Sequence, residues 1–137
     1  MDGRILAIDF GVKKCGLAVT DPLQITAQPL GTVATGTLMD YLTSYLQRET
    51  VVSFVVGDPS LHTPEGHTLL VSIDRFLEGL GKAFPQIPVY RQDETLTSQK
   101  VREIIMQSGV KKKKRRDKTL VDKVSAVLIL QEYLGHL

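Results

Sequence analysis

The sequence is poor in cysteine, in long apolar runs and in net charge, and two of these absences exclude a class of protein. Cys15 is the only cysteine in 137 residues, which excludes a disulfide-stapled secreted scaffold. No stretch approaches the ~18 uninterrupted apolar residues of a membrane span, so we expect no membrane partner. Because the N-terminus also lacks a long apolar signal region, we expect a cytoplasmic protein in a reducing compartment.

Length and apolar content predict one globular domain over residues 1–137. Domains average roughly 100 to 150 residues, and 42% of the chain is hydrophobic. About two-thirds of the unfolded surface can be buried at this length, so a core can form without disulfide or metal staples.

The formal charge of +2 hides an uneven distribution. Residues 100–123 contain ten Lys or Arg and three Asp or Glu, a local charge of +7, so the rest of the chain carries −5. At its centre are six consecutive basic residues, Lys111, Lys112, Lys113, Lys114, Arg115 and Arg116. Such a run indicates contact with a nucleic-acid backbone, because Lys and Arg displace counterions from a polyanion. A solvated loop is the alternative.

The first part of the chain predicts three strands in succession. Residues 4–10 and 16–20 are short apolar runs that fit a hairpin turning at residues 11–14. Residues 24–34 contain Pro29 and Gly31, which indicates an irregular or edge strand. Three strands without helices between them imply an antiparallel start to the sheet.

From residue 37 onward, helices alternate with strands. Apolar spacing predicts four helices, over 37–49, around 69–80, over 97–107 and over 118–134. Thr37 is the expected N-cap of the first helix, and the second is expected to end near Gly79 or Gly81. Residues 51–56 and 87–90 are predicted strands. Because this alternation calls for parallel pairing, the expected class is α/β, with a five-stranded mixed sheet flanked by about four helices.

Asp9 lies inside the most apolar of these segments, between Ile8 and Phe10. A buried carboxylate is costly without a partner, so Asp9 should have a cation, hydrogen-bond donors or a metal nearby. The alternative is an Asp at a strand end that caps the following turn, where Gly11 permits close backbone approach.

Three further acidic residues lie beside predicted elements, at two places in the chain. Asp93 and Glu94 follow the last predicted strand, and ligands gather at the carboxyl ends of parallel strands. Asp122 lies on the packed stripe of the last helix, one turn before Ala126. Stabilisation of a helix N-terminus is the simpler explanation at both places. The sharper hypothesis is a hard divalent cation held by Asp9, Glu94 and Asp122, since Mg²⁺ and Mn²⁺ favour oxygen ligands.

Four motifs occur in order along the chain. They are Asp9-Phe10-Gly11-Val12-Lys13, Val56-Gly57-Asp58-Pro59, Asp93-Glu94-Thr95-Leu96-Thr97-Ser98 and Asp122-Lys123-Val124-Ser125-Ala126. In sequence and spacing they resemble the YqgF family, a bacterial family of Holliday junction resolvases that is also described as pre-16S rRNA processing nucleases. The resemblance covers nearly the whole chain and implies an RNase H-like fold.

The resemblance also implies a metal-dependent endonuclease acting on structured nucleic acid. Position by position, the three acids of the family match Asp9, Glu94 and Asp122, which would hold one or two Mg²⁺ or Mn²⁺ ions. Lys13 and the basic run at 111–116 would hold the nucleic-acid backbone beside them. The implied partners are pre-rRNA, within ribosomal precursor particles, or branched DNA, for a protein that acts as a monomer or homodimer.

Two positions depart from the family pattern: Ser125 replaces one of two paired alanines, a small-for-small change, and the other departure removes a charge. Thr95 stands where the family usually has Arg, which removes a cation next to Glu94. Three functions therefore stay open: processing of the 5′ end of pre-16S rRNA, resolution of Holliday junctions in branched DNA, and nucleic-acid binding with little or no catalysis. A nucleotide phosphotransferase, which an Asp-x-Gly hairpin also resembles, would need two such domains, and the chain has the length of one.

Overall fold

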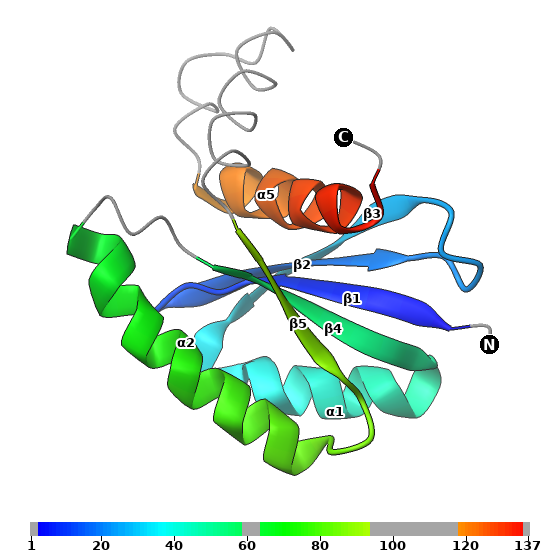
Figure 1. Cartoon of the computed structure of the whole chain (residues 1–137), viewed down its shortest axis with the longest axis horizontal. Helices are drawn as coiled ribbons and strands as arrows, with labels where there is room; N and C mark the ends of the chain where they lie inside the picture. Colours follow the sequence, from blue (N-terminus) through cyan, green and yellow to red (C-terminus); the bar gives the residue numbers. More distant parts are fainter. Residues whose placement is uncertain (1–2, 59–63, 94–117, 136–137) are drawn as a thin grey trace, which may run out of the picture.

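The computed structural model describes residues 3–58, 64–93 and 118–135, which build a five-stranded sheet between helices (Figure 1). The strands are β1 (Arg4–Asp9), β2 (Lys14–Thr20), β3 (Ala27–Ala34), β4 (Val51–Asp58) and β5 (Val89–Asp93), in the spatial order β3-β2-β1-β4-β5. The first three strands pair antiparallel, whereas β4 is parallel to both β1 and β5. The predicted mixed sheet with an antiparallel start is confirmed.

Within the described ranges, three α-helices flank the sheet. They are α1 (Leu38–Arg48), preceded by the short 3-10 helix η1 (Thr35–Thr37), α2 (Pro64–Ala83) and α5 (Lys118–Tyr133). The helix expected over 97–107 lies outside the described residues. None of the helices that the structure describes combines the length and apolar character needed to cross a membrane.

The two faces of the sheet carry separate apolar cores because side chains alternate along each strand. On one face, β-strand side chains pack against α1 and α2, and α5 covers the other face (Figure 1). Along β1, Leu6 and Ile8 belong to the first core, and Ile5 and Ala7 to the second. Among the described side chains of α5, Ala126, Ile129 and Leu130 are fully buried.

Two predicted boundaries are wrong for local reasons. The last strand begins at Val89 rather than 87, because Pro88 has no N–H for the ladder and only its carbonyl takes part, accepting from the Phe54 N–H at 2.9 Å. The second helix does not end at Gly79 or Gly81 but at Ala83. Its buried residues, Ile73 and Leu80, keep it packed on the sheet through both glycines.

Thr37 occupies the predicted N-cap position of α1 but does not cap the helix with its side chain. Its hydroxyl donates to the Ala34 carbonyl at 3.0 Å, within the preceding 3-10 turn. The irregular edge strand predicted from Pro29 and Gly31 is confirmed, since the β2–β3 register shifts at Leu17/Ala18, opposite these two residues.

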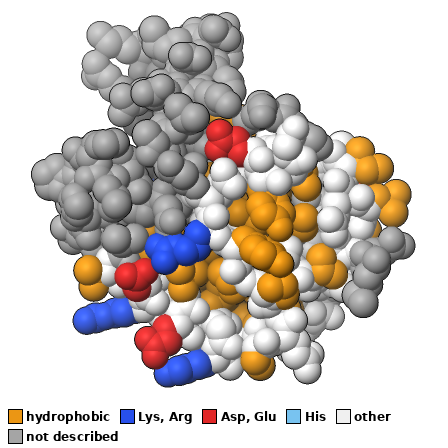
Figure 2. Space-filling model, viewed as in Figure 1, with side chains coloured by type: hydrophobic (Ala, Val, Ile, Leu, Met, Phe, Trp, Pro, Cys, Tyr) orange, Lys and Arg blue, Asp and Glu red, His pale blue; other side chains and the backbone are white. Residues whose placement is uncertain are grey.

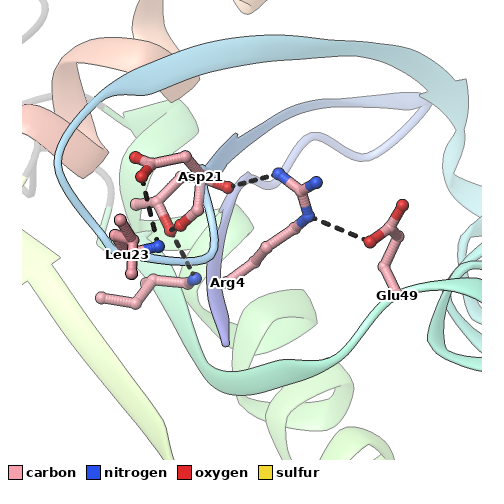
Figure 3. Close-up of polar contacts among 6 residues, drawn as sticks. Arg4, Asp21, Leu23 and Glu49 are labelled. Carbon is pink, nitrogen blue, oxygen red and sulfur yellow. Dashed lines mark hydrogen bonds and ion pairs between the residues drawn. The ribbon is translucent and has the colours of Figure 1, made fainter. Parts of the chain in front are cut away.

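The loop after β2 is organised by the Asp21 carboxylate (Figure 3). It accepts hydrogen bonds from the N–H groups of Leu23 (3.2 Å), Ile25 (2.8 Å) and Thr26 (2.7 Å), and from the Thr26 hydroxyl (3.2 Å). The bond from the Thr26 N–H is the main reason that the pKa of Asp21 lies below its ordinary value of 3.8. Next to this loop, Arg4 pairs with Glu49 at 3.2 Å.

The Asp21 loop predicts a pH dependence of stability at the acid end. A carboxyl whose pKa is lower in the folded chain stabilises the fold above its ordinary value of 3.8, and that contribution is lost as the pH falls through the folded pKa. Asp21→Asn should be less stable than the wild type at about pH 6, with the difference shrinking near about pH 2. Urea unfolding at both pH values measures this, and a difference independent of pH would contradict the role of the charge.

Candidate active site at the carboxyl edge of the sheet

Acidic residues end all three of the mutually parallel strands. β1 ends at Asp9, β4 at Asp58 and β5 at Asp93, and Asp58 is paired with Asp93 across the ladder. Because parallel strands end at the same side of a sheet, these positions lie along one edge, which we term the carboxyl edge. The edge is the place where the sequence predicted a ligand.

Strand alternation places Asp9 on the face that α5 covers. Ile5 and Ala7, two and four residues earlier, belong to the core beneath α5, whereas Ile8 and Phe10 belong to the opposite core. Asp9 is partly buried, at the point where the apolar strand gives way to the turn. A carboxylate in this position has access to solvent at the edge and a helix on one side.

The N-terminal end of α5 lies at the same edge. In Figure 1 the first turns of α5 and the last residues of β5 come together at the side of the sheet where β4 also ends. Position 122 is in the second turn of α5, four residues before the fully buried Ala126 on the same helical stripe. The fold thus brings the end of β1, the end of β5 and position 122 to one region.

Part of the predicted site lies outside the described residues. Glu94 directly follows the last residue of β5, and neither it nor Thr95 is described. The basic run at 111–116 also lies outside the described part. Of the three predicted metal ligands, only Asp9 has a described side chain. Among the side chains that are described, no group of three His, Cys, Asp or Glu residues could hold a metal ion.

The chemistry of Asp9 fits a hard divalent cation. A partly buried carboxylate supplies anionic oxygen, which Mg²⁺ and Mn²⁺ prefer over nitrogen or sulfur, and Mg²⁺ commonly takes one or two carboxylates and keeps several waters.

The turn between β1 and β2 projects from the same edge. Val12 and Lys13 are exposed at its tip, and 64% of the Val12 surface is accessible. The turn is tight, because a Cβ atom on Gly11 would lie 2.3 Å from the Lys14 carbonyl oxygen. Lys13, a predicted nucleic-acid contact, is therefore an exposed cation a few residues from Asp9.

Sequence reasoning missed Thr35, the first residue of η1, which contacts this turn directly after the end of β3. Its hydroxyl donates to the Gly11 carbonyl at 2.7 Å and its N–H donates to the Lys13 carbonyl at 2.9 Å. The residue is 24 positions from Gly11, and only the β2–β3 register brings the two together.

The surface of α2 differs from that expected of a nucleic-acid contact. Figure 2 shows Lys or Arg side chains alternating with Asp or Glu side chains in the region of α2 and β5. Lys82 pairs with Glu78 and Arg91 of β5 pairs with Asp74, both at 3.2 Å. Because these charges neutralise one another locally, the long-range attraction of a polyanion to α2 is weak.

Comparisons with known proteins match nearly the whole length of the chain. The model of the RuvX family, described as Holliday junction resolvase, matches residues 3–136. A protein of Porphyromonas gingivalis is 51% identical over 134 residues, covering 98% of this chain and 97% of its own length. A protein of Amoebophilus asiaticus is 44% identical over 133 residues, covering 97% of this chain and 94% of its own length. Both carry the name "Putative pre-16S rRNA nuclease".

Two solved structures share the fold. Thermus thermophilus RuvC in complex with a Holliday junction substrate superposes with a TM-score of 0.58 at 16% identity, over 97% of this chain and 96% of its own. The fowlpox virus Holliday junction resolvase superposes with a TM-score of 0.54 at 15% identity, over 98% of this chain and 99% of its own. These likenesses establish the RNase H-like architecture.

Proposed function

The chain belongs to the RuvX family of Holliday junction resolvases, a family of nucleases, and from this we propose that it is a metal-dependent endonuclease that processes the 5′ end of pre-16S rRNA. The observation that carries the proposal is the position of Asp9, at the carboxyl edge and on the face covered by α5. The chain is proposed to work as a single nuclease domain, in the cytoplasm, where ribosomal precursor particles are its partners.

The proposed mechanism uses three carboxylates and a set of cations. Asp9, Glu94 and Asp122 are proposed to hold one or two Mg²⁺ or Mn²⁺ ions. When bound, such ions would activate a water and stabilise the leaving oxygen of a phosphodiester. Lys13 and the basic run at 111–116 would bind phosphates on either side and orient the scissile bond, and contacts of this kind carry no sequence information.

A second candidate substrate is the four-way DNA junction. The family description and the name of the RuvC structure both refer to Holliday junctions, whereas the relatives with 44% and 51% identity are named for pre-16S rRNA. The higher identity of the rRNA-named relatives favours RNA. A protein that binds nucleic acid without cutting it is the third possibility.

A comparison of substrates distinguishes the three candidate functions, which are rRNA processing, junction resolution and binding without cleavage. Purified wild type is incubated with Mn²⁺ or Mg²⁺ and with labelled pre-16S 5′-end RNA, a four-way DNA junction, or plain RNA and DNA duplexes. We expect metal-dependent cleavage of the RNA near the mature end. Cleavage of the junction alone would favour the resolvase, and salt-sensitive binding without cleavage of any substrate would favour the binding protein.

Lys13→Ala should weaken nucleic-acid binding without changing which substrate is cut. Loss of one phosphate contact is expected to lower affinity several-fold and to reduce the slope of log K against log salt by about one. Lys82→Ala is the matched control, because Lys82 is also exposed but is paired with Glu78 on α2. Fluorescence anisotropy across a salt series measures both, and equal slopes for the two variants would remove Lys13 from the interface.

A further inference from the structure

A single residue, Thr35, holds the turn between β1 and β2 on both sides. The Thr35 hydroxyl donates to the Gly11 carbonyl at 2.7 Å, on the Asp9 side of the turn. The Thr35 N–H donates to the Lys13 carbonyl at 2.9 Å, on the β2 side. The two bonds come from different groups of one residue, so a substitution of the side chain removes the first and leaves the second.

In the described part of the chain, the Cys15 thiol is a second but weaker donor to the Gly11 carbonyl. The Cys15 thiol lies 3.8 Å from the Gly11 carbonyl and 3.4 Å from the Thr35 hydroxyl oxygen, but a thiol is a weak donor. Cys15 is fully buried, whereas Gly11 and Thr35 are partly buried, so the Gly11 carbonyl is partly shielded from water. Loss of the Thr35 hydroxyl should therefore make the backbone at Gly11, on the Asp9 side of the turn, more mobile.

The proposed reaction needs a metal-binding carboxylate and a phosphate-binding cation at a fixed distance from each other, and this turn connects the two. Asp9 lies two residues before Gly11, and Lys13 lies two residues after it at the exposed tip. With no space for a Cβ at Gly11, the path of the backbone between them is narrowly defined. Displacement of a reacting group by about 1 Å can cost about 100-fold in rate.

We propose that Thr35 is a positioning residue for the nuclease reaction: through the Gly11 carbonyl, its hydroxyl fixes the backbone that follows Asp9 and so fixes where the Asp9 carboxylate meets the metal. The inference rests on the proposed function. It also assigns the two bonds separate roles, because the hydroxyl acts on the Asp9 side and the N–H on the Lys13 side.

The test compares Thr35→Val, which removes only the hydroxyl, with Thr35→Ser, which keeps it. In Thr35→Val, kcat should fall about tenfold and the Mn²⁺ concentration for half-maximal rate should rise. KM for the nucleic acid should stay within about twofold, because the N–H bond that holds Lys13 is retained. Thr35→Ser should restore kcat. Thr43→Val is the matched control, since it removes an exposed hydroxyl that donates to the Met39 carbonyl within α1, at 2.8 Å.

Three results would overturn the proposal: wild-type kcat in Thr35→Val, a Thr35→Ser variant as slow as Thr35→Val, or an equal loss in Thr43→Val. If the wild type cleaves no substrate, the proposed function fails, and the positioning role is read from Mn²⁺-induced broadening of the Phe10 and Gly11 amide resonances. Broadening should be strong in the wild type and Thr35→Ser and weaker in Thr35→Val. Equal behaviour of all three proteins overturns the inference.

Discussion

Asp9→Asn is expected to lower the rate of cleavage by about a thousandfold or more while leaving the fold intact. The substitution keeps the size of the side chain and one acceptor oxygen but removes the negative charge that would bind the divalent cation. Because Asp9 is the last residue of β1 and only partly buried, we expect both cores to tolerate the change. Single-turnover cleavage at saturating Mn²⁺, together with urea unfolding, measures the two effects separately.

Asp21→Asn is the matched control for this variant. Asp21 follows β2, which runs antiparallel to β1, so Asp21 lies at the opposite end of the sheet from Asp9. It should retain wild-type cleavage even though it loses stability. Wild-type cleavage by Asp9→Asn would refute the assignment of Asp9, and equal losses in both variants would show a general effect on the fold.

Gly11→Ala should reduce both stability and activity. The added Cβ would lie 2.3 Å from the Lys14 carbonyl oxygen, a backbone atom that cannot move without shifting the start of β2. Overpacking of this kind typically costs about 1 to 3 kcal/mol in the free energy of unfolding. Since the shift also moves the backbone after Asp9, cleavage should fall more than about tenfold. Chemical unfolding and the cleavage assay measure the two losses.

Gly79→Ala is the control for this substitution. Gly79 lies inside α2, and a Cβ there would meet nothing within 4 Å. Replacing glycine by alanine inside a helix should stabilise the protein by about 0.5 to 1 kcal/mol, with no change in cleavage. A Gly11→Ala protein as stable and as active as Gly79→Ala would show that the turn can relax, and would weaken the positioning argument.

The architecture was predictable because apolar periodicity and turn residues agreed in most of the chain. The hairpin of β1 and β2, the buried strand β4 and the amphipathic α1 all follow such patterns, and Pro29 and Gly31 correctly indicated an edge strand. Sequence signals failed where tertiary contacts decided the outcome. α2 passes through two glycines because its buried face stays packed, and β5 starts after Pro88 because of the hydrogen-bond ladder.

The candidate site could be predicted in part. Asp9 was recognisable as an acid in an apolar strand, but its face became clear only when Ile5 and Ala7 were found beneath α5. Thr35 could not be found from sequence, since its contact with Gly11 depends on strand register rather than on spacing. Roles for Glu94, Asp122 and the basic run at 111–116 stay predictions.

The most direct test of the account is the cleavage rate as a function of Mn²⁺ concentration for the wild type and for Asp9→Asn, Glu94→Gln and Asp122→Asn, with pre-16S 5′-end RNA as substrate. If the three acids share one metal site, each single substitution should abolish most of the metal-dependent rate, and a double substitution should add little further loss. Retention of the wild-type rate and metal dependence in Glu94→Gln and Asp122→Asn would contradict a shared three-carboxylate site.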